Sequence, residues 1–169
     1  GGRGVYPLGP PHTKLVGGKT PLMLALSHMF SGTPATDRLG IEDVLREAGV
    51  GTAPKVNRVV IVGNRISPGN PVTKPDGTVV RTLWGELAWQ LGGKEAFAKV
   101  ATADASRTPP GQALHDLLAA YAPAVILIDE WVAYARSLVG RDDLAGGTFD
   151  DQFTFAPSLT EAVKGTPGV

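Results

Sequence analysis

The sequence contains no cysteine and no excess of charge of either sign. Without cysteine the chain can have no disulfide framework, no thiolate nucleophile and no cysteine-based zinc site. Lys and Arg number 16 and Asp and Glu number 16, so no overall positive field would hold a nucleic acid. No apolar run reaches the ~18 residues of a membrane span, and the first residues lack the apolar core of a signal peptide. We therefore expect a cytoplasmic protein with no membrane partner.

The sequence also lacks the side-chain patterns of a zinc site or of a serine hydrolase. His12, His28 and His115 are far apart in the sequence, and no G-x-S-x-G motif is present. Two acidic pairs, 142–143 and 150–151, are typical of loops and helix caps, and neither has an evident second set of metal ligands. Neither zinc chemistry nor a catalytic triad is therefore expected.

Glycine and proline are abundant and divide the chain into periodic segments. There are 22 glycines and 14 prolines, concentrated at the two ends and between the segments. Apolar residues at helical spacing, with caps such as Thr82 and Gly49, predict several helices. Their ranges are 19–30, 41–49, 81–91, 94–104, 111–122 and 129–140. A Pro-Asp-Gly turn within 67–80 predicts a small hairpin ahead of the third helix.

Two short aliphatic runs predict buried β-strands. The first is "RVVIVGN" at 58–64 and the second is "AVILI" at 124–128. Continuous apolar strands separated by helices favour a parallel sheet with helices on both faces. The fold class that we expect is therefore α/β, with three αβα layers and a mostly parallel sheet.

The tetrapeptide "GGKT" at 17–20 stands at the start of the first predicted helix. Gly17 and Gly18 would allow backbone N–H groups to turn onto phosphate oxygens, Lys19 would reach the β- and γ-phosphates, and Thr20 would bind magnesium. The strict phosphate-loop pattern has a further glycine where this chain has Thr13. Taken alone, the segment is equally consistent with a helix start that binds no nucleotide.

Two adjacent carboxylates, Asp129 and Glu130, follow the second predicted strand. In P-loop NTPases an aliphatic strand ends in an Asp that holds the magnesium shell, and a following Glu polarises the attacking water. The alternative is that the pair caps the next helix, where a carboxylate contributes about 0.3 to 1 kcal/mol. A Lys-Thr helix start and a later Asp-Glu strand end are the two halves of one magnesium nucleotide site, so their occurrence in this order favours the nucleotide interpretation.

Four stretches carry a resemblance to a known family: "TKLVGGKTPLMLALSHMFSG", "DGTVVRTLWGELAWQLGG", "AVILIDEWVAYARSLVGRDDL" and "GTFDDQFTFAPSLTEAVK". They resemble bacterial AAA+-like P-loop ATP-binding proteins of domain-of-unknown-function family 499. The resemblance covers most of the chain after about Thr13. It implies ATP binding with Mg²⁺, ATP hydrolysis, and a role in a multi-protein system of anti-phage defence or DNA modification. It also implies a homo-oligomer or a larger complex, because such sites are usually completed across subunits.

Several residues depart from the pattern of this family. Val16 resists the close phosphate approach that glycine allows, and Pro21 has no N–H to offer a phosphate. "VYPLGPPH" stands where an apolar strand should precede the loop. The strand expected between the loop strand and the Asp-Glu strand, with its polar sensor residue, is not found. Arg136 and Arg141 are the nearest candidates for an arginine finger, but their spacing is typical of solvated charges.

We therefore expect a poorly ordered segment over 1–12 and a partial P-loop NTPase domain over 13–169. Glu130 and Lys19 would be catalytic. Gly17, Gly18, Lys19 and Thr20 would bind ATP, and Thr20 and Asp129 would hold Mg²⁺. The alternative is a truncated or degenerate NTPase fold that acts as a non-catalytic interaction module, which the departures at Val16 and Pro21 favour.

Overall fold

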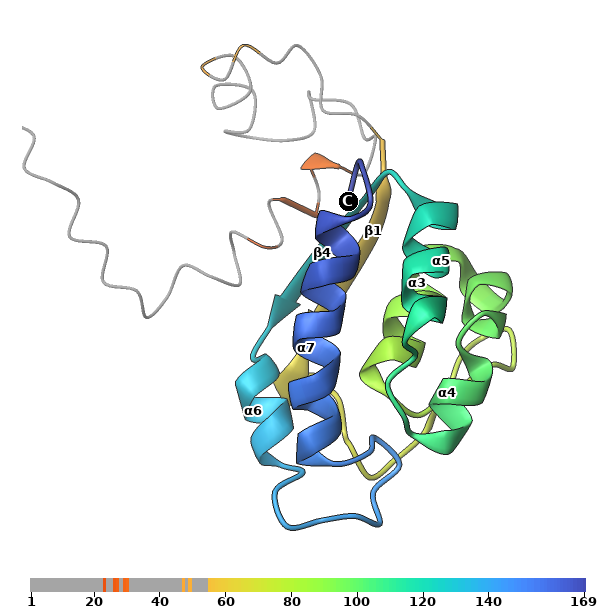
Figure 1. Ribbon diagram of the computed structural model, residues 1–169, viewed down its shortest axis with the longest axis vertical. Helices are drawn as coiled ribbons and strands as arrows, with labels where there is room; N and C mark the ends of the chain where they lie inside the picture. The colour runs from red at the N-terminus through yellow and green to blue at the C-terminus, as the bar shows by residue number, and fades with distance from the viewer. Residues whose placement is uncertain (1–22, 24–25, 28, 31–46, 48, 50–54) are drawn as a thin grey trace, which may run out of the picture.

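A computed structural model describes residues 23, 26–27, 29–30, 47, 49 and 55–169 of the chain. Figure 1 shows the arrangement of their helices and strands. In chain order these are β1 Asn57–Val62, the 3-10 helix η2 Gly63–Arg65, β2 Val72–Thr73, β3 Val79–Val80, α3 Leu83–Ala98, α4 Ala101–Ser106, α5 Gln112–Tyr121, β4 Ala124–Asp129, α6 Trp131–Arg136 and α7 Phe149–Lys164.

The two predicted aliphatic strands pair in parallel, as β1 and β4. Their register runs from Asn57 opposite Ala124 to Val62 opposite Asp129, so both strands end at the same edge of the sheet. In Figure 1 the two strands lie side by side, with α7 running along them. The prediction of parallel pairing is confirmed for these strands, whereas the wider P-loop fold stays a prediction.

The core lies on one face of this sheet. Val59 and Ile61 are 0% and 1% exposed and pack with side chains of α3, α5 and α7. Val60 and Val62, which alternate with them, are half-buried. The prediction that β1 is fully buried is therefore wrong for the second face, because the three long helices in the described part of the chain all pack against the first. Helical cover on both faces stays a prediction.

Helix α3 begins where the sequence predicts. Thr82 is its N-cap, and the Thr82 side chain accepts a hydrogen bond from the Gly85 N–H at 3.0 Å. The helix is broken at Gly92 and Gly93, whose backbones are not helical. This break agrees with the division between the predicted helices over 81–91 and 94–104. The second predicted helix is wrong as one element, because its first half belongs to α3, which ends at Ala98, and its second half forms α4.

The predicted hairpin is confirmed as β2 and β3, which pair antiparallel. Its turn is closed by the Thr78 N–H, which donates to Asp76 at 2.9 Å, and Gly77 supplies a positive φ of 83°. Lys74 joins the hairpin to α3, because its ammonium lies 2.6 Å from Glu86 and 4.4 Å from the centre of the Trp89 ring. The hairpin is thus held against α3 through Glu86 and Trp89.

Helix α7 is not among the predicted helices, although the sequence carries a signal for its start. Thr148 and Asp151 form a reciprocal capping box at its N-terminus, which confirms the helix-cap interpretation for the second acidic pair. Pro157 lies inside the helix and obscures its pattern in the sequence. Phe155 anchors α7 to the core, with its ring 5.3 Å from Trp84 and 5.6 Å from Trp131.

The first two predicted helices fall mostly outside the described residues. Met23, Leu26, Ser27 and Met29 are helical, in agreement with a helix over 19–30. Gly49 has a φ of 69°, as a C-terminal glycine cap requires. Among the residues that the structure describes, no helix is both long and apolar enough to cross a membrane.

Candidate functional site

The candidate site lies at the edge of the sheet where β1 and β4 end. Asp129 is the last residue of β4 and is half-buried, and Glu130 follows it and is exposed. On the neighbouring strand, β1 ends at Val62 and continues into Gly63. The carboxyl ends of parallel strands are where open α/β sheets bind ligands. Both predicted acids therefore lie at the edge that this rule selects.

Glu130 has an uncommon backbone conformation, with φ 54° and ψ 28° in the left-handed region. Its N–H donates to Asp129 Oδ1 at 2.9 Å. Its carbonyl accepts from the Tyr134 N–H at 3.1 Å, and this is the first hydrogen bond of α6. A left-handed non-glycine residue is held there by its surroundings and is often found at functional sites. The backbone at Glu130 is thus fixed at both ends by hydrogen bonds.

The helix-capping alternative is weaker for Glu130 than for Thr148. Glu130 occupies the N-cap position of α6, but its side chain makes no capping hydrogen bond. By contrast, Thr148 caps α7 with its side chain. Within the described part of the chain, the Glu130 carboxylate is therefore exposed and not used to cap the helix.

The segment that follows "GGKT" docks on β1 through three described residues. The Phe30 carbonyl accepts from the Val56 N–H at 3.4 Å, and the Ser27 carbonyl accepts from Arg58 Nη1 at 2.8 Å. Met23 lines a cavity further along β1 that Val60 and Val62 also line. From Phe30 back to Met23, the segment therefore advances from the start of β1 toward its carboxyl end.

Val62 and Asp129 belong to the same face of the sheet. Side chains alternate between faces along a strand, and Asp129 is in register with Val62. Val62 and Val60 point away from the core and line the Met23 cavity. Ile61, which faces the core, lines the cavity as well, so the cavity lies along the edge of β1 opposite to β4 and not on one face alone.

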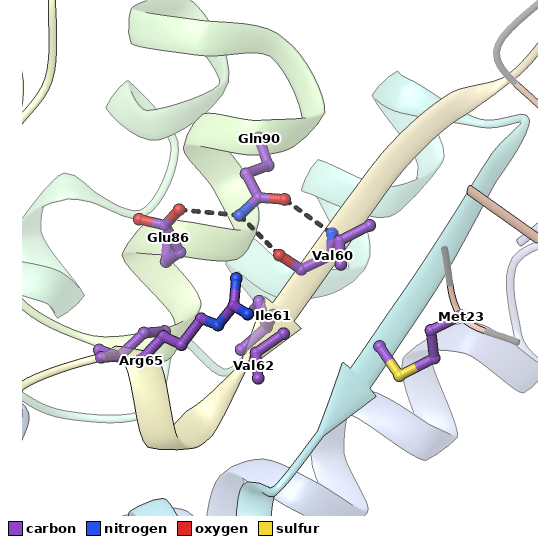
Figure 2. A pocket seen from close by; sticks show the side chains of 8 residues that line it. Met23, Val60, Ile61, Val62, Arg65, Glu86 and Gln90 are labelled. Carbon is purple, nitrogen blue, oxygen red and sulfur yellow. Dashed lines mark hydrogen bonds between the residues drawn. The ribbon is translucent and has the colours of Figure 1, made fainter. Parts of the chain in front are cut away.

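The Met23 cavity has a volume of about 280 Å³ and lies along β1 (Figure 2). Gln90 forms part of its polar wall. The Val60 N–H donates to Gln90 Oε1 at 2.7 Å, and Gln90 Nε2 donates to the Val60 carbonyl at 3.0 Å and to Glu86 at 2.8 Å. Gln90 thus pairs with the backbone N–H and carbonyl of Val60 at the edge of β1, as a neighbouring strand would. Neither Asp129 nor Glu130 lines this cavity.

The predicted phosphate loop lies outside the described residues. The residues concerned are Gly17, Gly18, Lys19 and Thr20, and also Val16 and Pro21, which depart from the family pattern. Their predicted roles in binding ATP and Mg²⁺ therefore stay predictions. The structure brings together Asp129 and Glu130, together with Gly63 from the neighbouring strand.

The other charged residues considered in the sequence have local roles. Arg141 pairs with Asp143 through two hydrogen bonds, of 2.9 and 3.0 Å, and both side chains are more than half exposed. This pairing lowers the pKa of the Asp143 carboxyl. Arg136 is exposed at the end of α6. Among the described residues there is no group of three or more His, Asp or Glu side chains placed to hold a metal ion.

Comparison with known proteins identifies the family. A family model described as the DUF499 N-terminal domain matches residues 3–167. The chain belongs to the DUF499 family. The resemblance carried by the four stretches is thereby confirmed at the level of the family. No curated protein and no solved structure matches this DUF499 domain.

Sequence reasoning missed Gly63, which shapes the site of the DUF499 domain. A Cβ atom at Gly63 would lie 2.3 Å from the Glu130 carbonyl oxygen, so only glycine fits without a shift. The signal was present as the Gly-Asn that closes the first aliphatic run, but in the sequence it is typical of any turn. The contact between Gly63 and Glu130 depends on the register of β1 and β4, which the sequence alone does not give.

Proposed function

We propose that this DUF499 domain is a P-loop ATPase domain of AAA+ type that binds ATP with Mg²⁺ at the carboxyl edge of its sheet. Asp129 holds the magnesium shell through water, and Glu130 polarises the attacking water. Lys19 contacts the β- and γ-phosphates, Thr20 binds the magnesium, and the amides of Gly17 and Gly18 contact phosphate oxygens.

One observation carries this proposal: the direction in which the Met23 segment lies on β1. Phe30 contacts the start of the strand, and Met23 lines the cavity that the later residues Val60 and Val62 also line. Lys19 precedes Met23 by four residues, which correspond to about 6 Å if the helix continues. Extended by that distance, the segment leads toward the edge at which Asp129 and Glu130 lie. The two halves of the sequence motif are thus compatible with a single site.

The exposed Glu130 carboxylate gives a second argument. A residue kept in the left-handed region, without a capping hydrogen bond from its side chain, is better explained by chemistry at the site than by helix stability. The rival proposal is a non-catalytic interaction module, favoured by Val16 and Pro21. The ATPase proposal extends to coupling with a partner, in a homo-oligomer or in a DNA-modification or defence complex, as the family resemblance implies.

The first test is binding of a fluorescent ATP analogue in the presence of Mg²⁺. We expect the Lys19→Ala variant to bind about 10- to 100-fold more weakly than the wild-type chain, because a charged hydrogen-bond donor to the phosphates is lost. Lys164→Ala is a matched control, since Lys164 is exposed and pairs only with the exposed Glu161 in the described part of the chain. Equal affinity in wild type and Lys19→Ala, or no binding to either, would support the interaction module.

A further inference from the structure

Gly63 and Glu130 approach each other more closely than any side chain at position 63 would allow. An added Cβ atom would lie 2.3 Å from the Glu130 carbonyl oxygen and 2.9 Å from its carbonyl carbon. It would also lie 3.0 Å from Tyr134 Cβ. Two of these three atoms belong to the backbone, so the clash cannot be relieved by turning a side chain.

The requirement for glycine is one of space and not of backbone freedom. Gly63 is buried at the start of η2, and it is not among the positive-φ glycines of the described chain. A Cβ atom would therefore act on the neighbouring strand end, by pushing the Glu130 carbonyl away. That carbonyl accepts the first hydrogen bond of α6, from the Tyr134 N–H. Displacement of the carbonyl would move the Glu130 backbone and the start of α6 together.

Tyr134 makes the contact rigid from the other side. Its side chain is buried, and burial raises the pKa of the Tyr134 phenol to about 12, so the ring remains neutral and inside the core. A Cβ atom at Gly146 would lie 2.2 Å from the Tyr134 hydroxyl, so the ring is also enclosed at its far end. Tyr134 therefore has little room to yield to a larger residue at position 63.

We infer that Gly63 is a positioning residue for Glu130. Because Gly63 has no side chain, the Glu130 carbonyl can pack directly against its backbone. This contact sets the direction in which the Glu130 carboxylate points from the edge of the sheet. This inference rests on the proposed ATPase function for its effect on catalysis. The contact itself is a property of the fold. The required glycine thus couples the end of β1 to the acid at the end of β4.

The test compares Gly63→Ala with Gly69→Ala in the full chain. Gly69 is an exposed turn glycine whose added Cβ would make only an ordinary 3.5 Å contact with Leu144. We expect kcat for ATP hydrolysis to fall about 10- to 100-fold in Gly63→Ala, with the affinity for the fluorescent ATP analogue within about twofold of wild type. Gly69→Ala should match wild type in both. A parallel loss of affinity and kcat, or no loss of either, would overturn the inference.

A second readout does not depend on catalysis. Amide hydrogen exchange at Tyr134 should be at least about 10-fold faster in Gly63→Ala than in Gly69→Ala, because the hydrogen bond to the Glu130 carbonyl is disturbed. Unchanged exchange would overturn the inference even if hydrolysis were altered. If the wild-type chain hydrolysed no ATP, the proposed function would fail. Amide hydrogen exchange at Tyr134 would still test whether Gly63 positions the Glu130 backbone. If Gly63→Ala did not fold, nuclear Overhauser contacts between Gly63 Hα and Tyr134 Hβ in the wild-type chain would decide it: their presence supports the inference and their absence overturns it.

Discussion

The Glu130→Gln variant is expected to hydrolyse ATP at least about 100-fold more slowly than the wild-type chain while binding ATP with unchanged affinity. An amide has the size of the carboxylate but cannot polarise the attacking water, and a general base contributes 10²- to 10⁴-fold. The exposed side chain makes no capping hydrogen bond, so its replacement should leave α6 intact. Phosphate release and binding of a fluorescent analogue, measured on the same preparation, check both halves of this prediction.

The control for Glu130→Gln is Glu161→Gln. Glu161 lies on the exposed side of α7, where it pairs with Lys164 at 2.9 Å, far along the chain from the acid pair. Its replacement should change neither hydrolysis nor binding. Hydrolysis that survives in Glu130→Gln at the wild-type rate would remove Glu130 from the mechanism, whatever the affinity for ATP.

The Asp104→Ala variant is expected to lower the free energy of unfolding by about 2 to 5 kcal/mol, because two buried Thr82 donors would each lose an acceptor at about 1 to 3 kcal/mol. Asp104 is 0% exposed. Its carboxylate accepts hydrogen bonds from the Thr82 N–H at 2.9 Å, from the Thr82 hydroxyl at 2.7 Å and from the Arg81 N–H at 3.1 Å. Arg81 Nη1 adds an ion pair at 3.6 Å. Alanine would leave the two Thr82 donors buried without this acceptor at the N-terminus of α3. Denaturant unfolding followed by tryptophan fluorescence measures the loss.

Two further variants separate the hydrogen bonds from the charge. Asp104→Asn retains one oxygen that can accept from Thr82, so its cost should be smaller than that of Asp104→Ala. Asp116→Ala should cost less than about 0.5 kcal/mol, since Asp116 is exposed and accepts one hydrogen bond, from Gln112. An Asp104→Ala chain as stable as Asp116→Ala would contradict the structural role assigned to this carboxylate.

Local features of the fold were predictable because their signals are local. Thr82 as a cap, the Asp76–Gly77 turn and the two aliphatic strands each depend on residues within a few positions of one another. The role of Asp104 was not predictable, because its partners Arg81 and Thr82 lie more than twenty residues earlier and meet it only through packing.

The candidate site divides in the same way. The sequence predicted Asp129 and Glu130 from one strand and its end, and the structure places both at the expected edge. The left-handed backbone of Glu130 and its contact with Gly63 could not be predicted, since they depend on the register of β1 and β4. Half-burial on the second face of β1 was missed for the same reason, because a run of aliphatic residues does not tell which face a helix covers.

The most direct test of the central claim, that Asp129 and the "GGKT" loop form one magnesium nucleotide site, is the Mg²⁺ dependence of affinity for a fluorescent ATP analogue. The measurement compares wild type with Asp129→Asn and with Asp142→Asn, an exposed loop carboxylate. We expect that Asp129→Asn loses about 10-fold or more of the affinity gained with Mg²⁺, while Asp142→Asn keeps all of it. The same Mg²⁺ dependence in all three chains would exclude Asp129 from the magnesium nucleotide site.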